Sequence, residues 1–218
     1  MIRAALFDMD GLLFDTEQVH MQAAIDCGVK HGHAITRQMT IDTLGVNEKG
    51  CSAYFKERFP TFDPDTFWAD FHQYLYDYVR EKGMPLKPYC REILENLRAN
   101  GVKLALVSSS QSSDINFYLD RTGLREYFSV IISGDMGLKS KPEPDVYLRA
   151  AELLQVDIHE CAVLEDSPYG LASGRSAGAR TYMVPDLKPY TEEMAAITDI
   201  VVPTLKEACE DILSRVCR

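Results

Sequence analysis

The chain has 218 residues, of which 46% are hydrophobic, and a formal net charge of -10. This composition is typical of a globular protein, and it argues against a nucleic-acid partner or an anionic membrane surface, because both require a basic surface. No apolar run approaches the ~20 residues needed to span a bilayer, and the chain reaches its first strand pattern too early for a signal peptide. We therefore expect a cytoplasmic protein with no nucleic-acid or membrane partner.

The cysteines are scattered and form no Cys-x-x-Cys pair, which argues against a zinc site and against a disulfide framework. We expect reduced, buried thiols at Cys27, Cys51, Cys90, Cys161, Cys209 and Cys217. The sequence does not determine the oligomeric state, for which a monomer is the working expectation.

Short apolar runs with little polar alternation predict buried parallel strands. They lie at 2–7, 103–107, 130–132, 162–164, 180–184 and 199–202. Segments with helical periodicity lie between them, near 88–100, 112–122, 144–154, 168–177 and 204–216. This alternation predicts an α/β fold with a doubly wound, Rossmann-like parallel sheet.

Residues 14–83 interrupt the alternation, because they carry only helix signals. The candidate helix caps are Asp15 or Thr16, Thr36, Asn47 and Asp63. We expect a helical-bundle domain inserted into a core domain formed by residues 1–13 and 84–218. An apolar stripe on the last helix predicts the hydrophobic core of the insert; it consists of Phe67, Trp68, Phe71, Leu75, Tyr78 and Val79.

Polar side chains follow several of the predicted strands. They are Asp8 and Asp10 after the first, the serine-rich run 108–113 after the second, Lys141 ahead of the helix near Pro144, and Glu165 with Asp166 after the fourth. Ligands of open parallel sheets bind beyond the carboxyl ends of the strands, so we expect these side chains to meet at one edge. Taken singly, each has a simpler interpretation, such as a helix cap or a solvated lysine; the prediction depends on the joint pattern.

Clustered carboxylates repel one another unless protons or a cation neutralise them. Oxygen ligands without nearby His or Cys favour a hard ion, and Mg²⁺ suits a site that also binds phosphate. The pattern predicts phosphoryl transfer, in which one carboxylate attacks phosphorus and forms an aspartyl-phosphate. Mg²⁺, Lys141 and the Ser108 hydroxyl would offset the charge on the transferring oxygens.

At these residues the sequence resembles the haloacid dehalogenase-like hydrolase superfamily, in its branch of β-phosphoglucomutases and small phosphatases. The matching motifs are "FDMDGLLFDTE", the Ser of "LALVSSS", the Lys of "KSKPEPD" and "LEDSPYGLASGRSAG". The resemblance implies that Asp8 is the nucleophile and that Asp10 is the general acid and base. It implies Mg²⁺ binding by the Asp8 carboxylate, the Asp10 backbone carbonyl and Asp166, with Glu165 as a further candidate ligand.

The same resemblance implies that Ser108 and Lys141 bind the phosphate, and the neighbouring Ser109 is a further candidate. Thr16 and His20 match the Asp-Thr pair and the following His of the branch, and are candidates for contacts with substrate. Residues 14–83 would form the cap that covers the site and selects substrates.

The sequence departs from a mutase at two positions. Glu48 stands at the spacing where the mutases have a cap arginine, and Gln111 or nearby serines replace a lysine. Because a mutase must bind two phosphates, these departures favour a Mg²⁺-dependent phosphatase of small phosphorylated metabolites, such as sugar phosphates. A β-phosphoglucomutase is the alternative enzyme.

Two alternatives from other classes are weaker. A receiver-type signalling module also combines an acidic cluster, a hydroxyl and a lysine, but it needs no helical lid. A decayed enzyme serving as a binding scaffold is disfavoured, because all four motif positions retain competent chemistry.

Overall fold

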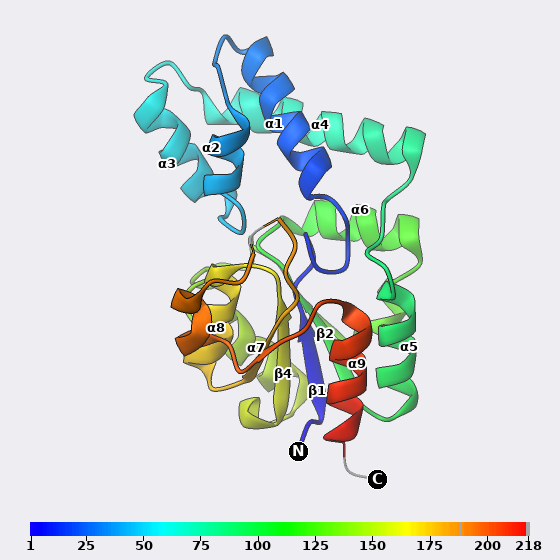
Figure 1. Cartoon of the computed structure of the whole chain (residues 1–218). Coiled ribbons are helices and arrows are strands. Elements are labelled where there is room, and N and C mark those ends of the chain that lie inside the picture. The colour runs from blue at the N-terminus through cyan, green and yellow to red at the C-terminus, as the bar shows by residue number, and fades with distance from the viewer. Residues whose placement is uncertain (188, 217–218) are drawn as a thin grey trace.

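A computed structural model describes residues 1–187 and 189–216 (Figure 1), so Cys217 lies outside the described residues. Within these ranges, six parallel strands form one sheet in the order β3-β2-β1-β4-β5-β6. They are β1 (Ala4–Phe7), β2 (Lys103–Val107), β3 (Val130–Ile132), β4 (Cys161–Glu165), β5 (Arg180–Met183) and β6 (Ile200–Val201). The predicted doubly wound α/β fold is confirmed, and each predicted strand is present with its ends shifted by two residues or fewer.

Both faces of the sheet are apolar, because successive residues of a strand point to opposite sides. Ala5 and Phe7 of β1 belong to one buried cluster, whereas Ala4 and Leu6 belong to another. The first cluster includes α5 (Cys90–Ala99), α6 (Ser112–Thr122) and α9 (Leu205–Ser214); the second includes α7 (Asp145–Leu154) and α8 (Pro168–Ala177). Helices therefore cover both faces, as the alternation of elements predicts.

Three short 3-10 helices were not predicted from the sequence: η1 (Arg125–Tyr127), η2 (Ile158–Glu160) and η3 (Glu192–Ile197). Helical segments of three to six residues carry too little periodicity to be distinguished from loops. None of the described helices combines the length and the apolar character needed to cross a bilayer.

Four helices lie between β1 and α5, above the carboxyl ends of the strands (Figure 1). These helices, which we call the helical insert, are α1 (Glu17–Lys30), α2 (Arg37–Asp42), α3 (Glu48–Arg58) and α4 (Pro64–Lys82). The side chains of Thr36, Asn47 and Asp63 accept capping hydrogen bonds, as predicted. Thr16 occupies the cap position of α1 but makes no capping bond; its backbone is helical rather than extended, and its hydroxyl donates to Asp10.

The apolar stripe of α4 is divided between two clusters. Phe67, Phe71 and Leu75 pack in a cluster internal to the insert, whereas Val79 belongs to the cluster of α5, α6 and α9, against which Tyr78 also packs. The prediction that the whole stripe forms the core of the insert is therefore wrong for its last turn. The reason is that α4 extends past the other insert helices and onto the α/β core.

A hydrogen-bonded cluster joins the insert to α6 of the core. His72 of α4 lies between Glu48 Oε1 of α3, at 2.9 Å, and Asp114 Oδ2 of α6, at 3.2 Å. Gln111 Nε2 donates to Glu48 Oε2 at 3.0 Å, and the Tyr76 hydroxyl donates to Asp114 Oδ1 at 2.5 Å. We call Glu48, His72 and Asp114 the interface cluster. Burial lowers the pKa of His72, but the bonds to Asp114 and Glu48 outweigh burial and raise the pKa to about 9.

Replacing Phe67 by alanine should destabilise the insert. Phe67 is 1% exposed, and its ring centroid lies 4.9 Å from that of Phe62 and 5.9 Å from that of Phe55. The cavity left by Phe67→Ala should reduce the free energy of unfolding by about 3–5 kcal/mol in urea denaturation. Val29→Ala, at a site 71% exposed, is the control and should cost less than about 0.5 kcal/mol. A loss below about 1 kcal/mol for Phe67→Ala would contradict the packing described.

The interface cluster should make stability depend on pH. The pKa of His72 is about 9 in the folded protein and 6.5 in an ordinary setting, so its stabilising effect is complete below pH 6.5 and is lost as the pH rises through 9. The free energy of unfolding should fall over this interval by up to about 3 kcal/mol. His72→Gln should flatten that part of the stability profile, measured by denaturation from pH 6 to pH 10.

Gln73→Asn, at an exposed neighbouring position of α4, provides the matched control and should keep the wild-type profile. An identical slope in wild type and His72→Gln would show that the ion pairs of His72 do not stabilise the fold.

Candidate active site

The carboxyl ends of three neighbouring strands bring the predicted site residues together. β1 pairs with β2 on one side and β4 on the other, so the residues that follow these strands meet at one edge. A cavity of about 160 Å³ opens there, between the sheet and the insert. The predicted residues that line it are Asp8, Asp10, His20, Ser108, Ser109, Lys141 and Asp166. Thr16 and Glu165 contact these residues from behind the cavity surface.

Lys141 binds two carboxylates in the interior of the protein. Its Nζ donates to Asp8 Oδ1 at 2.5 Å, to Glu165 Oε1 at 2.6 Å and to the Val107 carbonyl oxygen at 3.0 Å. The side chains of Lys141 and Glu165 are 3% and 0% exposed. Burial lowers the pKa of Lys141, but Asp8 and Glu165 raise it above its ordinary value. The lysine is therefore a fixed positive charge at the edge of the sheet.

Carboxyl groups outnumber cationic groups at this edge. Ligand oxygens of Asp8, Glu165 and Asp166 lie within 4.8 Å of one another, and the ammonium group of Lys141 pairs with Asp8 and Glu165. Burial raises the pKa of Asp8 to about 8, with Glu165 adding to the rise and Lys141 opposing it. Burial, then Asp8 and Glu165, raise the pKa of Asp166 well above its usual range. An all-oxygen set of crowded carboxyl groups fits a hard divalent cation, which would favour their ionised forms.

The position of Glu165 depends on the start of α8. Ser167 caps this helix and also donates its hydroxyl to Glu165 Oε2 at 2.9 Å, while the Tyr147 hydroxyl donates to Oε1 at 2.6 Å. Gly170 leaves room for the carboxylate, because a Cβ at that position would lie 1.7 Å from Oε1. Both oxygens of Glu165 therefore have protein partners, and its main contact with the cavity is through Lys141.

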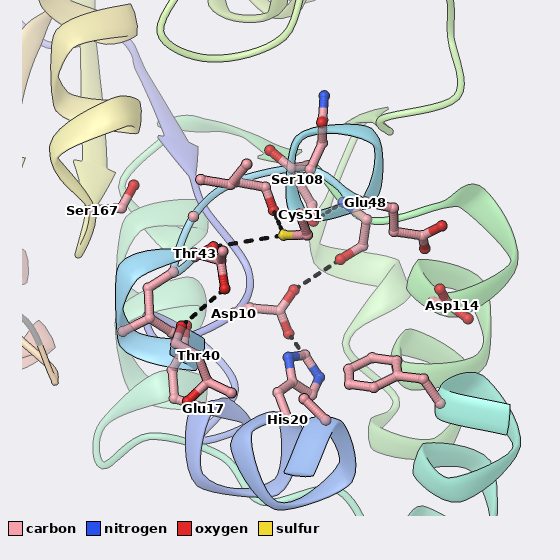
Figure 2. Close-up of a pocket in the computed structure, with 18 of the residues that line it drawn as sticks. Asp10, Glu17, His20, Thr40, Thr43, Glu48, Cys51, Ser108, Asp114 and Ser167 are labelled. Atoms are coloured by element: carbon pink, nitrogen blue, oxygen red, sulfur yellow. Dashed lines mark hydrogen bonds and ion pairs between the residues drawn. The ribbon is translucent and has the colours of Figure 1, made fainter. Parts of the chain in front are cut away.

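Asp10 is held on both carboxylate oxygens. The Thr16 hydroxyl donates to Oδ1 at 2.7 Å, and the Ser110 hydroxyl donates to Oδ2 at 3.0 Å. His20 Nε2 faces the same carboxylate, 3.8 Å from Oδ1 (Figure 2). Burial lowers the pKa of His20, so its neutral form is favoured. Asp10 and His20 together can transfer a proton to or from a ligand in the cavity.

Ser108 and Ser109 line the cavity between β2 and α6. Ser108 is 3% exposed, and its Oγ accepts a hydrogen bond from the Ser110 backbone N–H at 3.0 Å. The Ser108 hydroxyl hydrogen is thus free to be donated to an anionic ligand oxygen. This serine-rich loop and Lys141 supply the donors that a phosphate group requires.

Several residues of the site were not singled out in the sequence. Ser110 lies in the predicted serine-rich run, but nothing distinguishes it from its neighbours as the partner of Asp10. Tyr147 gives no signal, because its contact with Glu165 spans 18 residues. The interface cluster also lines the cavity, and only the unusual glutamate at position 48 indicated it in the sequence.

Comparisons with known proteins agree with this geometry. The chain is 30% identical to hexitol phosphatase B of Escherichia coli strain K12 over 221 residues, covering 97% of each chain. The crystal structure of a putative β-phosphoglucomutase from Thermotoga maritima is 29% identical, with a TM-score of 0.77, and the match covers 99% of this chain and 100% of that one. The crystal structure of CbbY from Rhodobacter sphaeroides in complex with phosphate is 26% identical, with a TM-score of 0.84. That match covers 97% of this chain and 100% of the CbbY chain.

A family sequence profile also matches most of the chain. Residues 5–184, which include Asp8, Lys141 and Asp166, match the profile of the haloacid dehalogenase-like hydrolases. The family resemblance inferred from the motifs is therefore confirmed, and a receiver-type signalling module is excluded. The chain belongs to the haloacid dehalogenase-like hydrolase family.

Proposed function

We propose that this protein is a Mg²⁺-dependent phosphatase of small phosphomonoesters, of which sugar phosphates are the favoured class. The observation that carries the proposal is the buried contact of Lys141 with Asp8 and Glu165, next to Asp166. This arrangement places a carboxylate nucleophile, a fixed cation and a set of metal-ligating oxygens around one cavity. The phosphatase names of relatives that share the family support the same reaction class.

Asp8 would attack the phosphorus atom and form an aspartyl-phosphate, while Asp10 protonates the oxygen of the departing alcohol. Asp10 would then accept a proton from the water that hydrolyses the intermediate. Ser108, Ser109 and Lys141 would bind the phosphoryl oxygens, and Lys141 would offset their charge as the bond to the alcohol breaks. Thr16 and Ser110 orient the Asp10 carboxylate for both proton transfers, and His20 lies beside it.

Asp8, Asp166 and the backbone carbonyl of Asp10 are the proposed ligands of Mg²⁺. Glu165 contributes negative charge and positions Lys141, because both of its oxygens already accept hydrogen bonds. A bound Mg²⁺ would neutralise the carboxylates and favour the ionised form of Asp8 that attacks phosphorus.

We further propose that residues 14–83 form a cap domain over a core of residues 1–13 and 84–218. The insert supplies much of the cavity wall, and Asn47 Nδ2 donates to Ser140 Oγ of the core at 2.7 Å. A cap of this kind would exclude water during the first step and determine which alcohol group fits. The cytoplasm remains the proposed compartment, where the five described cysteines, all buried thiols, would stay reduced.

A β-phosphoglucomutase is the second candidate, favoured by the structural neighbour with that title. A mutase needs basic side chains to bind a second phosphate. In this chain Glu48 and Gln111, which are hydrogen-bonded to each other, stand at the positions where the mutases have basic residues. Incubation with β-glucose 1-phosphate distinguishes the two activities. Free phosphate supports the phosphatase, and glucose 6-phosphate without free phosphate supports the mutase.

Replacing the nucleophile should abolish turnover. In a panel of sugar monophosphates, Asp8→Asn should reduce phosphate release from the best substrate by at least ~1,000-fold, because the amide cannot form the aspartyl-phosphate. Asp15→Asn is the matched control, since the Asp15 side chain is 51% exposed and pairs with Lys87 outside the site. A folded Asp8→Asn protein that releases phosphate at the parent rate would disprove the proposed role of Asp8.

Removing divalent ions should abolish activity and lower stability. Phosphate release should stop in excess EDTA and return with Mg²⁺, and Mg²⁺ should raise the Tm of the wild-type protein because it relieves repulsion among the buried carboxylates. Asp166→Asn should lose most of this Tm increase. Full activity in EDTA, or an unchanged Tm response in Asp166→Asn, would contradict the proposed metal site.

A further inference from the structure

The cavity has a second polar wall, formed by residues outside the group of Asp8, Lys141 and Asp166. Glu48 and Asp114 lie on this wall, and Ser167, which follows Asp166, lies on the other side of the cavity (Figure 2). His72, which contacts both Glu48 and Asp114, also lines the cavity. Glu48 and Asp114 come from the insert and the core, so the wall forms where the two parts meet. Asp8 and this wall line the same cavity, so, if the proposed function is correct, the wall is available to the part of a substrate that lies beyond its phosphate.

The interface cluster carries net negative charge. It contains two carboxylates and one imidazole, so it remains negative even when His72 is protonated. Lys141 is the one lysine or arginine among the described lining residues, and it is already bound to Asp8 and Glu165. No lysine or arginine among the described residues of this wall is therefore available to bind a second phosphate.

The carboxylates of the wall can instead accept hydrogen bonds from alcohol groups. Gln111, Tyr76 and His72 hold the oxygens of Glu48 and Asp114 in place, and each carboxylate has about four acceptor positions in total. A hydroxyl group can donate to the remaining positions, whereas an ionised phosphate offers only acceptors and like charge.

Apolar side chains of the insert complete the cavity. Val46, Trp68 and Phe71 are among those that line it, beside the polar wall. They can contact the carbon skeleton of a ligand and keep water away from the carboxylates. With less water present, the carboxylates attract hydroxyl hydrogens more strongly and also repel a second phosphate more strongly.

We propose that the interface cluster is a specificity element, which selects phosphomonoesters whose far end carries hydroxyl groups and rejects those with a second phosphate. The inference rests on the proposed phosphatase activity and names the substrate class of the same site. Glu48 is the residue best suited to test the inference. It belongs to the insert, and it has no proposed role in the chemistry at phosphorus.

The experiment compares two ligands that differ in one phosphate, sorbitol 6-phosphate and sorbitol 1,6-bisphosphate. The wild-type kcat/KM should be at least ~100-fold higher for the monophosphate, because like charges oppose binding of the second phosphate. Glu48→Arg should narrow this ratio by at least ~10-fold, chiefly by lowering KM for the bisphosphate. Glu48→Gln, which keeps the size of the side chain, should also reduce the ratio of the two kcat/KM values, but by a smaller factor than Glu48→Arg.

Glu57→Arg is the matched control, since the Glu57 side chain lies on the same helix and is 80% exposed. It should leave the ratio at the wild-type value. Comparable wild-type kcat/KM values for the two ligands would overturn the inference, as would an unchanged ratio in a folded Glu48→Arg or Glu48→Gln protein that still hydrolyses the monophosphate. Absence of phosphate release from every monophosphate tested would instead refute the proposed function itself.

Discussion

The buried contact of Lys141 with Asp8 and Glu165 is the interaction on which the rest of the site depends. It joins the segments after β1, before α7 and at the end of β4, which are far apart in the sequence. Removing one member of such a buried group leaves an uncompensated charge, which costs about 3–5 kcal/mol in other proteins. The same lysine thus orients the carboxylate of Asp8, the proposed nucleophile, and joins three segments at the carboxyl edge of the sheet.

The crowded carboxylates at the carboxyl edge of the sheet lower the stability of the folded protein. Lys141 offsets only part of the repulsion among Asp8, Glu165 and Asp166, and burial, with Glu165 adding to it, raises the pKa of Asp8. A protein selected for stability alone would place apolar residues or fewer carboxylates here. The repulsion that remains favours binding of a divalent cation, so the cost to the folded protein and the affinity for the ion have the same origin.

The sequence was most informative where topology alone determines position. Asp8 and Asp166 could be identified as neighbours because they follow two strands of one parallel sheet, whose carboxyl ends lie along one edge whatever the details of packing. Lys141 lies in the loop between β3 and α7, and the joint motif pattern was needed to include it. The interface cluster could not be identified in this way, since its members come from three helices whose relative orientation the hydrophobic periodicity does not define. For the same reason the division of the α4 stripe between two clusters required the structure, because periodicity identifies a buried face but not the partner that covers it. The hydrogen bond from Tyr147 to Glu165 could not be predicted either, because periodicity does not identify the partner of a single side chain.

The division of α4 also gives the insert a mechanical property. Val79 is fixed in the cluster beside the sheet, whereas Phe67 lies in the insert about 18 Å away along the helix axis, at 1.5 Å per residue. If α4 tilts as a rigid rod about Val79, a rotation of about 10° displaces the Phe67 end by about 3 Å. Between these two residues His72 and Tyr76 bind Asp114 of α6, so such a tilt would have to break these contacts or move α6 with the helix.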